Sequence, residues 1–569
     1  MPIAIHALTR CAIVVIIVFS KQSSALLRLS TASLKWQSSS DSQGGCARLA
    51  NHETFFTVDV EVGTPKQSFS VVADTGSDSL IIPSCTCVET GHCNTGANEP
   101  CFQGTGRSST FKIPSGPEGP PMAVLTFGSG AIKAAIASDA VTVGGVTTFM
   151  KQGVLLMTDQ ALDIATPFEG ILGLGPPRKY SVGDLTVGDN TTEYAAAAAR
   201  QPGSPMPAAL GTQEAAAAEL VLGPGHNAKS FLREAGVSHF SLCYNSLGDG
   251  ALRLGTPPQA NGMRSVGKLH WGLDFRGIKI GDATEPMAFC QPENMTEGQE
   301  TACGGIPDSG TTVLAAPTEH LMMLVDGMCD GWERCSSQYR ALQEAATQAH
   351  DAVEDKVGSD PWGIAPLSKT QVFLQLLDDC ASWLPDSPGG LSELPTLHFQ
   401  VGDLSGNHQT LDLPPQAYVL EMKQEDEQVV FQFSRGLKRQ LLRRSTSNTR
   451  QQQQMPTATA NRTVCAPAFE PMQYVTQKNG PVWILGMPFF YQYQVHYNLD
   501  PSNPTIAFSD SPCGACQGST AAGASASEGN DPHGLVSLSP RLASMHPKRI
   551  TKPLRGRLGG RDQHALSSF

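Results

Sequence analysis

Two short stretches of the chain each place one aspartate directly after an apolar run. Asp74 follows the run 69–73 and opens an Asp-Thr-Gly-Ser turn, and Asp308 opens an Asp-Ser-Gly-Thr turn. Solvated turn aspartates would not need apolar residues on both sides. Two carboxyl groups brought together can share one proton, so that one serves as a base and the other as an acid. The pair therefore indicates general acid–base chemistry.

The surroundings of the two aspartates also repeat. Ile171-Leu172-Gly173 lies downstream of Asp74, and Ile484-Leu485-Gly486 lies downstream of Asp308. One such turn alone would be weak evidence, because Asp-Ser-Gly is common in turns. A pattern that occurs twice predicts two related halves, each of which supplies one aspartate.

The elements that must position these turns are expected to be mainly β. Period-two alternation in 55–63 predicts a strand with one apolar face. Its apolar positions are Phe56, Val58, Val60 and Val62. Helical periodicity is clearest at Glu319–Met328 and Tyr339–Val357. A chain of 569 residues exceeds a single domain, so a core divided between at least two lobes is expected.

The N-terminus has the pattern of a secretory signal peptide. Arg10 precedes the apolar stretch Cys11–Phe19, and small residues follow at Ser23 and Ala25, so residues 1–25 are predicted to be the signal. The alternative, an uncleaved membrane anchor, is weaker because the apolar run is about half the length that spans a bilayer. No other segment is long enough to span.

Cysteine usage agrees with secretion. Fifteen cysteines less Cys11 of the signal leave an even number, which an oxidising compartment would pair. Sequons at Asn190, Asn294 and Asn461 fit the same compartment.

One cysteine-rich loop leaves two interpretations open. Cys85, Cys87, His92 and Cys93 have ligand types and spacing that a zinc ion could use. Thiols this close more often form small disulfide loops in an oxidising compartment, and Cys101 offers a further partner. The disulfide interpretation is the stronger one.

Charge and composition exclude several functions. A net charge of −12 argues against nucleic acid as a partner. Low-complexity stretches at 186–224 and 436–460 are predicted to be surface loops, and residues 517–569 a disordered basic tail. Neither a Gly-x-Ser-x-Gly elbow nor a His-Glu-x-x-His motif occurs, and 170–175 lacks the ending of a phosphate loop. We expect no metal and no cofactor.

The two-part pattern closely resembles the pepsin-like (A1) family of aspartic proteases across about residues 51–516. Further matches are TPKQSFSVVADTGS at 64–77, LTFGSGAIKAAIASDAVTVGG at 125–145 and FSLCYNSLGDGALRLG at 240–255. The resemblance implies a mainly β, bilobal fold with two pseudo-twofold-related lobes around a central cleft. Residues 51–238 would form the N-terminal lobe, and residues 239–516 the C-terminal lobe with insertions.

The resemblance also implies roles for the turn residues. Asp74 and Asp308 would activate a water between them for attack on a peptide carbonyl, without metal or covalent intermediate. Six neighbours would support them: Thr75 and Ser309 by linking the two loops, Ser77 and Thr311 by bonding the outer carboxylate oxygens, and Gly76 and Gly310 by letting backbone amides approach.

The expected flap departs from the family pattern. The family usually has a Tyr before the flap glycine and a Trp after the first catalytic loop. Here Phe127 precedes Gly128 and Ser129, and Ile81 replaces the Trp. In the family, the Tyr hydroxyl and the Trp indole normally hydrogen-bond to each other. Losing both side chains therefore leaves no unpaired hydrogen-bond donor. We expect an apolar flap in which Phe127 packs against Ile81.

The second half is longer than the first, with insertions expected at 320–370 and 423–460. The sequence DSGTT, and a Cys380 that can pair with Cys465, resemble the β-secretase branch of the family. Further disulfide candidates are Cys329, Cys335, Cys290 and Cys303.

A short prosegment is expected at residues 26–50, with Arg28, Lys35 and Arg48 as candidates to cover the aspartates in a zymogen. The predicted function is a monomeric endopeptidase of the secretory pathway, secreted or in an acidic vesicular or vacuolar compartment. It would hydrolyse proteins or peptides at acidic pH and have no stable membrane span. The rival is a pseudoprotease that binds a partner on the same fold, and a weaker third hypothesis is a structural secreted glycoprotein.

Overall fold

The structure is a computed structural model that describes residues 44–93, 100–114, 119–127, 130–162, 169–176, 219–222, 229–246, 248–357, 367–424 and 462–516. Several expected segments lie outside these residues in whole or large part: the signal peptide 1–25, the prosegment 26–50, the loops 186–224 and 436–460, and the tail 517–569. Within the described part of the chain, no helix combines the length and apolar character needed to cross a membrane.

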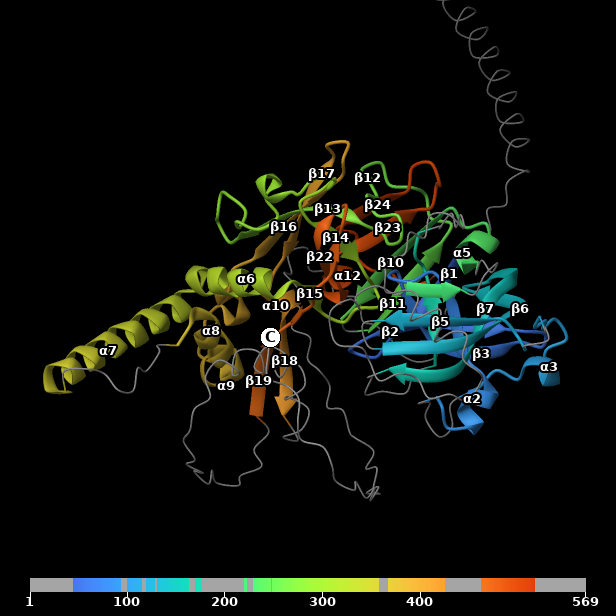
Figure 1. Ribbon diagram of the computed structural model, residues 1–569, viewed down its shortest axis with the longest axis horizontal. Helices are drawn as coiled ribbons and strands as arrows, with labels where there is room; N and C mark the ends of the chain where they lie inside the picture. Colours follow the sequence, from blue (N-terminus) through green and yellow to red (C-terminus); the bar gives the residue numbers. More distant parts are fainter. Residues whose placement is uncertain are drawn as a thin grey trace, which may run out of the picture.

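The larger sheet has fourteen strands in the order β12-β24-β23-β10-β11-β1-β2-β3-β8-β4-β7-β6-β5-β9. It joins strands from the first half of the chain to strands near its end (Figure 1). Its members are β1 Gly45–Asn51, β2 Phe56–Val62, β3 Gln67–Asp74, β4 Leu80–Pro83, β5 Met122–Phe127, β6 Gly130–Val143, β7 Val146–Leu162, β8 Ile171–Gly173, β9 Glu219–Leu222, β10 His239–Asn245, β11 Gly248–Leu254, β12 Met263–Arg264, β23 Gln494–Asn498 and β24 Thr505–Ser509.

A second sheet belongs to the later half of the chain. Its strands run β17-β16-β13-β14-β22-β15-β20, and β21 pairs with β22. They are β13 Leu273–Ile280, β14 Gly304–Pro307, β15 Leu314–Ala316, β16 Leu397–Gly402, β17 His408–Leu413, β20 Phe469–Pro471, β21 Val475–Thr476 and β22 Gly480–Leu485. A two-stranded sheet pairs β18 Val419–Gln424 with β19 Arg462–Pro467. The protein is thus mainly β, with the bilobal plan of the pepsin-like fold.

The helices are short except for a group in the later half. The short ones are α2 Cys85–Glu89, α3 Gly104–Arg107, α5 Phe231–Glu234, α9 Cys380–Trp383, α10 Pro415–Tyr418, α12 Met487–Gln492, η1 Pro292–Asn294 and η2 Gly390–Glu393. The longer ones are α6 Thr318–Gly331, α7 Glu333–Val357 and α8 Lys369–Asp378. The helical periods seen in the sequence fall within α6 and α7, and α7 projects away from the sheets (Figure 1).

The internal repeat is visible in strand pairing. β3 pairs in parallel with β8, so that Asp74 lies opposite Gly173. In the second half β14 pairs in parallel with β22, and Pro307, the residue before Asp308, lies opposite Leu485. An added Cβ at Gly173 would lie 2.2 Å from a backbone nitrogen, and one at Gly486 would lie 2.1 Å from a backbone oxygen. Each Ile-Leu-Gly element ends in glycine because another backbone segment passes too close to leave room for a side chain.

Strand β2 shows how the sequence alternation sets the core. Phe56, Val58, Val60 and Val62 are fully buried, whereas Asp59 between them is exposed. These side chains belong to a hydrophobic cluster that also includes core residues of the second sheet. The two sheets therefore share buried apolar packing, which stabilises their relative placement.

The N-terminal strand differs from the expected prosegment of residues 26–50. Gly45–Asn51 forms β1 in the interior of the large sheet, between β11 and β2. Arg48, expected to cover the aspartates, instead forms an ion pair with Asp249 at 2.5 Å on an exposed part of β1. The difference arises because strand pairing, not local sequence pattern, makes this segment part of the sheet. Arg28 and Lys35 lie outside the described residues.

Disulfides pair all fourteen cysteines of the described residues. The pairs are Cys46–Cys516, Cys85–Cys101, Cys87–Cys93, Cys243–Cys513, Cys290–Cys303, Cys329–Cys335 and Cys380–Cys465. Each of the six candidate cysteines named from the sequence has a partner in this set. The sulfurs of the Cys85–Cys101 loop are disulfide sulfurs, which removes the thiolates that the zinc interpretation required. Asn294 is exposed on η1, as an acceptor for glycan requires.

A testable consequence concerns the helical insertion. Replacing both Cys380 and Cys465 with Ala should cost about 4.5 kcal/mol of unfolding free energy, because this bond closes a loop with a separation of 85 residues. Removing Cys329–Cys335, with a separation of 6 residues, should cost about 2.2 kcal/mol. Denaturant unfolding of both double variants measures the difference. Equal losses would contradict the loop-entropy explanation.

Candidate active site

The fold brings the two sequence-predicted aspartates face to face. Asp74 is the last residue of β3, and Asp308 directly follows β14. A Cβ added at Gly76 would lie 2.8 Å from an Asp308 carboxylate oxygen, and one at Gly310 would lie 2.5 Å from an Asp74 oxygen. Each glycine therefore lies against the carboxyl group of the opposite loop. A side chain at either position would push the two carboxyl groups apart.

Each carboxyl group receives two matching hydrogen bonds. The amide of Gly76 donates to Asp74 Oδ1 at 2.8 Å, and the hydroxyl of Ser77 donates to Oδ2 at 2.5 Å. The second loop repeats this arrangement around Asp308. There the Gly310 amide donates at 2.9 Å and the Thr311 hydroxyl at 2.6 Å. Two donors on each carboxylate fix its plane.

Thr75 and Ser309 join the two loops beneath the carboxyl groups. The Thr75 amide donates to the Ser309 hydroxyl at 3.0 Å, and the Ser309 amide donates to the Thr75 hydroxyl at 2.9 Å. Each hydroxyl then donates to a carbonyl of the opposite strand, that of Pro307 or Ala73, at 2.9 and 2.7 Å. Both side chains are buried. These four bonds form a reciprocal link between the halves of the chain.

Burial and charge act together on Asp74. Its side chain is 7% exposed. Removal from water raises the pKa of the Asp74 carboxyl well above its usual range, and the neighbouring Asp308 carboxylate raises it further. The hydrogen bonds from Ser77 and Gly76 oppose this shift because they favour the charged form. The arrangement therefore retains a proton at pH values where a solvated aspartate has lost its own.

Two buried tyrosines support the same loops and were not singled out from the sequence. Tyr244 on β10 donates its hydroxyl to the Ser309 carbonyl at 2.8 Å, and Tyr497 on β23 reaches the Pro307 carbonyl at 3.4 Å. Both come from strands distant in sequence from the loops. Tyr244 does lie inside the family-like stretch 240–255, which is the signal that could have pointed to it.

The expected flap is the hairpin of β5 and β6, in which Phe127 pairs with Gly130. Phe127 is half-buried and packs against a hydrophobic cluster whose members include the fully buried Ile81. The other two expected flap residues, Gly128 and Ser129, lie outside the described residues. The surroundings of Phe127 are thus apolar, and its direct packing against Ile81 stays a prediction.

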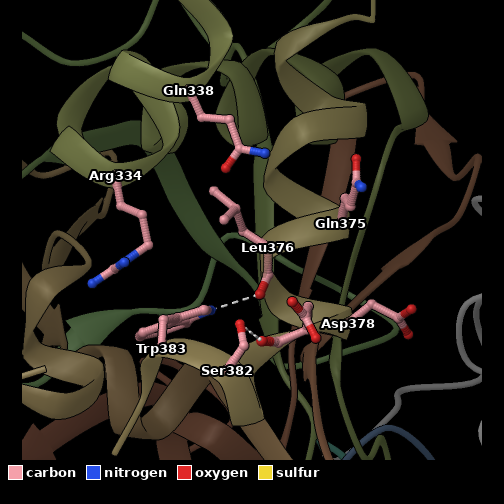
Figure 2. A pocket seen from close by; sticks show the side chains of 8 residues that line it. Arg334, Gln338, Gln375, Leu376, Asp378, Ser382 and Trp383 are labelled. Carbon is pink, nitrogen blue, oxygen red and sulfur yellow. Dashed lines mark hydrogen bonds between the residues drawn. The ribbon is translucent and has the colours of Figure 1, made fainter. Parts of the chain in front are cut away.

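A polar hollow lies elsewhere, on the helical insertion. Its volume is about 510 Å³, and Figure 2 shows its lining by α7, α8 and α9. Arg334 at its wall forms an ion pair with Glu393 at 2.9 Å, and this pairing lowers the pKa of Glu393 to about 2. The lining residues are Arg334, Gln338, Gln375, Leu376, Asp378, Asp379, Ser382 and Trp383. None of them belongs to the aspartate loops, so this hollow is separate from the candidate active site.

One grouping among the described residues has metal-ligand atom types close together. Atoms of Cys290, Cys303 and His320 lie within 4.8 Å of one another. The two cysteines are joined in a disulfide, and His320 accepts a hydrogen bond from the Trp483 indole at 3.1 Å. These groups are already engaged with one another, so the cluster has the character of a structural core.

Comparison with known proteins agrees with this geometry. The family model described as eukaryotic aspartyl protease matches residues 55–203, which include Asp74. Relatives are aspartic proteinase A1 of Arabidopsis thaliana, 28% identical over 47% of this chain and 43% of its own length, and dog renin (Canis lupus familiaris), 31% identical over 49% and 57%. Guinea pig cathepsin E (Cavia porcellus) is 26% identical over 52% and 64%.

The fold and the facing aspartate loops resemble those of the aspartic proteases. Residues 55–203 match the eukaryotic aspartyl protease family, and the chain is similar to pepsin-like proteases over about half of its length. The match spans about half the length of the curated relatives. Asp308 lies beyond the matched segment 55–203, so its equivalence to Asp74 depends on the internal repeat.

The link between the loops should be strongly stabilising. Thr75→Val removes the hydroxyl that accepts from the Ser309 amide and donates to the Pro307 carbonyl, which leaves buried groups unsatisfied. A loss of about 2–4 kcal/mol is expected. Thr90→Val, whose hydroxyl is on an exposed helix end, should cost under about 1 kcal/mol. Chemical unfolding measures the free energy of unfolding of both variants. Similar losses would show that the Thr75–Ser309 link stabilises the protein no more than an exposed hydroxyl does.

The raised pKa of Asp74 should appear in the pH dependence of stability. The native chain binds a proton that the unfolded chain releases at lower pH, so the free energy of unfolding falls as pH rises from the ordinary aspartate range through the raised value. Asp308→Asn removes a charge that raises this pKa and should make the fall shallower. Urea unfolding over a pH series measures the slope. Asp386→Asn, an exposed site with the same charge change, should leave the slope unchanged.

Proposed function

We propose that the chain is an aspartic endopeptidase, with Asp74 and Asp308 as its catalytic pair. The observation that carries the proposal is the facing of two carboxyl groups, each held by two donors and joined through Thr75 and Ser309. Two carboxyl groups this close share one proton at acidic pH. The pair then presents one base and one acid to the same small volume.

The proposed reaction uses this shared proton. A water between the carboxyl groups gives a proton to the ionised member as it attacks the peptide carbonyl carbon, and the protonated member donates to the carbonyl oxygen. The tetrahedral intermediate then breaks its carbon–nitrogen bond as the member that took the water's proton gives it to the leaving nitrogen, and the other member takes a proton from a hydroxyl of the intermediate, which restores the shared proton. Neither a metal ion nor a covalent intermediate is required. The hydrogen bonds from Gly76 and Ser77 keep Asp74 oriented throughout.

The same proposal includes substrate class and location. A protein or peptide would bind across the pair and beneath the β5–β6 hairpin, where the half-buried Phe127, packed on the cluster that includes Ile81, offers apolar contact to its side chains. The seven disulfides among the described residues support a chain that matures in the secretory pathway, for secretion or for an acidic vesicular or vacuolar compartment. We propose that it acts there as a monomer.

Peptide cleavage by the purified full chain tests the proposal. A peptide library incubated over an acidic to neutral pH series should be cut, and a statine-type inhibitor should block the cutting. Asp74→Asn and Asp308→Asn should each lower kcat/KM by about 1000-fold or more, and the double variant should be little worse, because catalytic partners act as a unit.

Two results would favour other functions. Asp386→Asn serves as the matched control and should retain full activity, since this exposed aspartate lies outside the pair. Substantial cutting by either single Asn variant would overturn the mechanism. Peptide binding without cutting by the unmodified chain would favour the pseudoprotease.

A further inference from the structure

His270 makes a contact with the first aspartate loop that neither the sequence pattern nor the proposed function includes. It lies in the turn between β12 and β13, whose ends are joined by the Val266 amide donating to the Gly272 carbonyl at 2.9 Å. Its Nδ1 is 2.9 Å from the carbonyl oxygen of Gly76, 194 residues earlier in the chain. The ring is buried, with 7% of its surface exposed.

The partner atom identifies which ring nitrogen carries a proton. A carbonyl oxygen can only accept, so Nδ1 of His270 is the donor.

The Gly76 carbonyl occupies a sensitive place in the loop. It belongs to the peptide unit between Gly76 and Ser77, and these two residues supply both donors to the Asp74 carboxylate. Because a peptide unit is planar, holding its carbonyl restricts the rotation of the backbone on both sides. A bond to this oxygen thus limits the movement of both donors.

The next residue supports the other side of the same loop. The Trp271 indole is fully buried and donates to the Leu174 carbonyl at 2.9 Å, while the Leu174 amide donates to the Asp74 carbonyl at 2.7 Å. His270 and Trp271 therefore hold two backbone segments that flank Asp74. Both side chains come from the connection into the second sheet.

We propose that His270 is a positioning residue that holds the Gly76–Ser77 peptide, and through it the two donors to Asp74, in the orientation that the catalytic pair requires. This inference rests on the proposed function of the pair. His270 acts through the backbone of the loop and makes no contact with the substrate.

The test compares substitutions that keep or remove the donor. His270→Phe keeps a buried ring without the N–H, and His270→Asn places an amide N–H at the position of Nδ1. Phe should lower kcat by about 3- to 10-fold, the equivalent of one hydrogen bond, with little change in KM. Asn should restore most of the loss. The pH profile of the Phe variant should shift to higher pH, because weaker donors favour the charged form of Asp74 less.

His496→Phe is the matched control. His496 is also buried, with 9% of its surface exposed, and bonds the Ser509 hydroxyl at 3.1 Å on a strand away from Gly76. It should lower stability without changing kcat or the pH profile of the folded fraction.

The outcomes separate this inference from the proposed function. An unmodified chain that cuts no peptide overturns the proposed function. An active chain in which His270→Phe keeps the kcat and pH profile of the unmodified protein overturns the positioning role alone. If His270→Phe fails to fold, the His270→Asn variant provides the test. The positioning role then requires that this variant keep a kcat and a pH profile close to those of the unmodified chain. A folded Asn variant with a strongly reduced kcat would contradict the proposal.

Discussion

The reciprocal hydrogen bonds between Thr75 and Ser309 are the constraint on which the rest of the site depends. They join two loops that are 234 residues apart in the chain, and both side chains are buried. Two nearby carboxylates repel each other, so an independent pair of loops would separate. Because the link opposes that separation, the pKa of the Asp74 carboxyl is raised, first by burial and further by the neighbouring Asp308 carboxylate. The chemistry proposed for the pair is a consequence of this mechanical coupling.

The sequence predicted those parts of the site that consist of short local motifs. The two Asp-[Ser/Thr]-Gly turns and the two Ile-Leu-Gly elements lie where the repeat placed them, and β2 buries its alternating side chains. Contacts between distant segments could not be predicted in this way. His270 carries no recognisable motif, and Gly45–Asn51 becomes a strand only through its pairing with β11 and β2.

The second half of the chain combines the repeated core with a helical insertion. Helices α6, α7 and α8 follow β15, and α8 and α9 lie against β19. The Cys380–Cys465 bond fastens α9 to the same strand. The hollow of Figure 2 belongs to this insertion and not to the aspartate loops. The hydrogen bonds around Asp308 nevertheless match those around Asp74 in the half of the chain without the helical insertion.

The proposed mechanism requires Asp74 and Asp308 to share one proton. Infrared difference spectroscopy of the unmodified chain against Asp74→Asn tests it directly, because a protonated carboxyl group has a C=O stretch distinct from that of a carboxylate. At a pH where solvated aspartates are ionised, the difference spectrum should contain one protonated-carboxyl band assigned to the pair. A spectrum that shows only the loss of an ionised carboxylate would contradict proton sharing between the two aspartates.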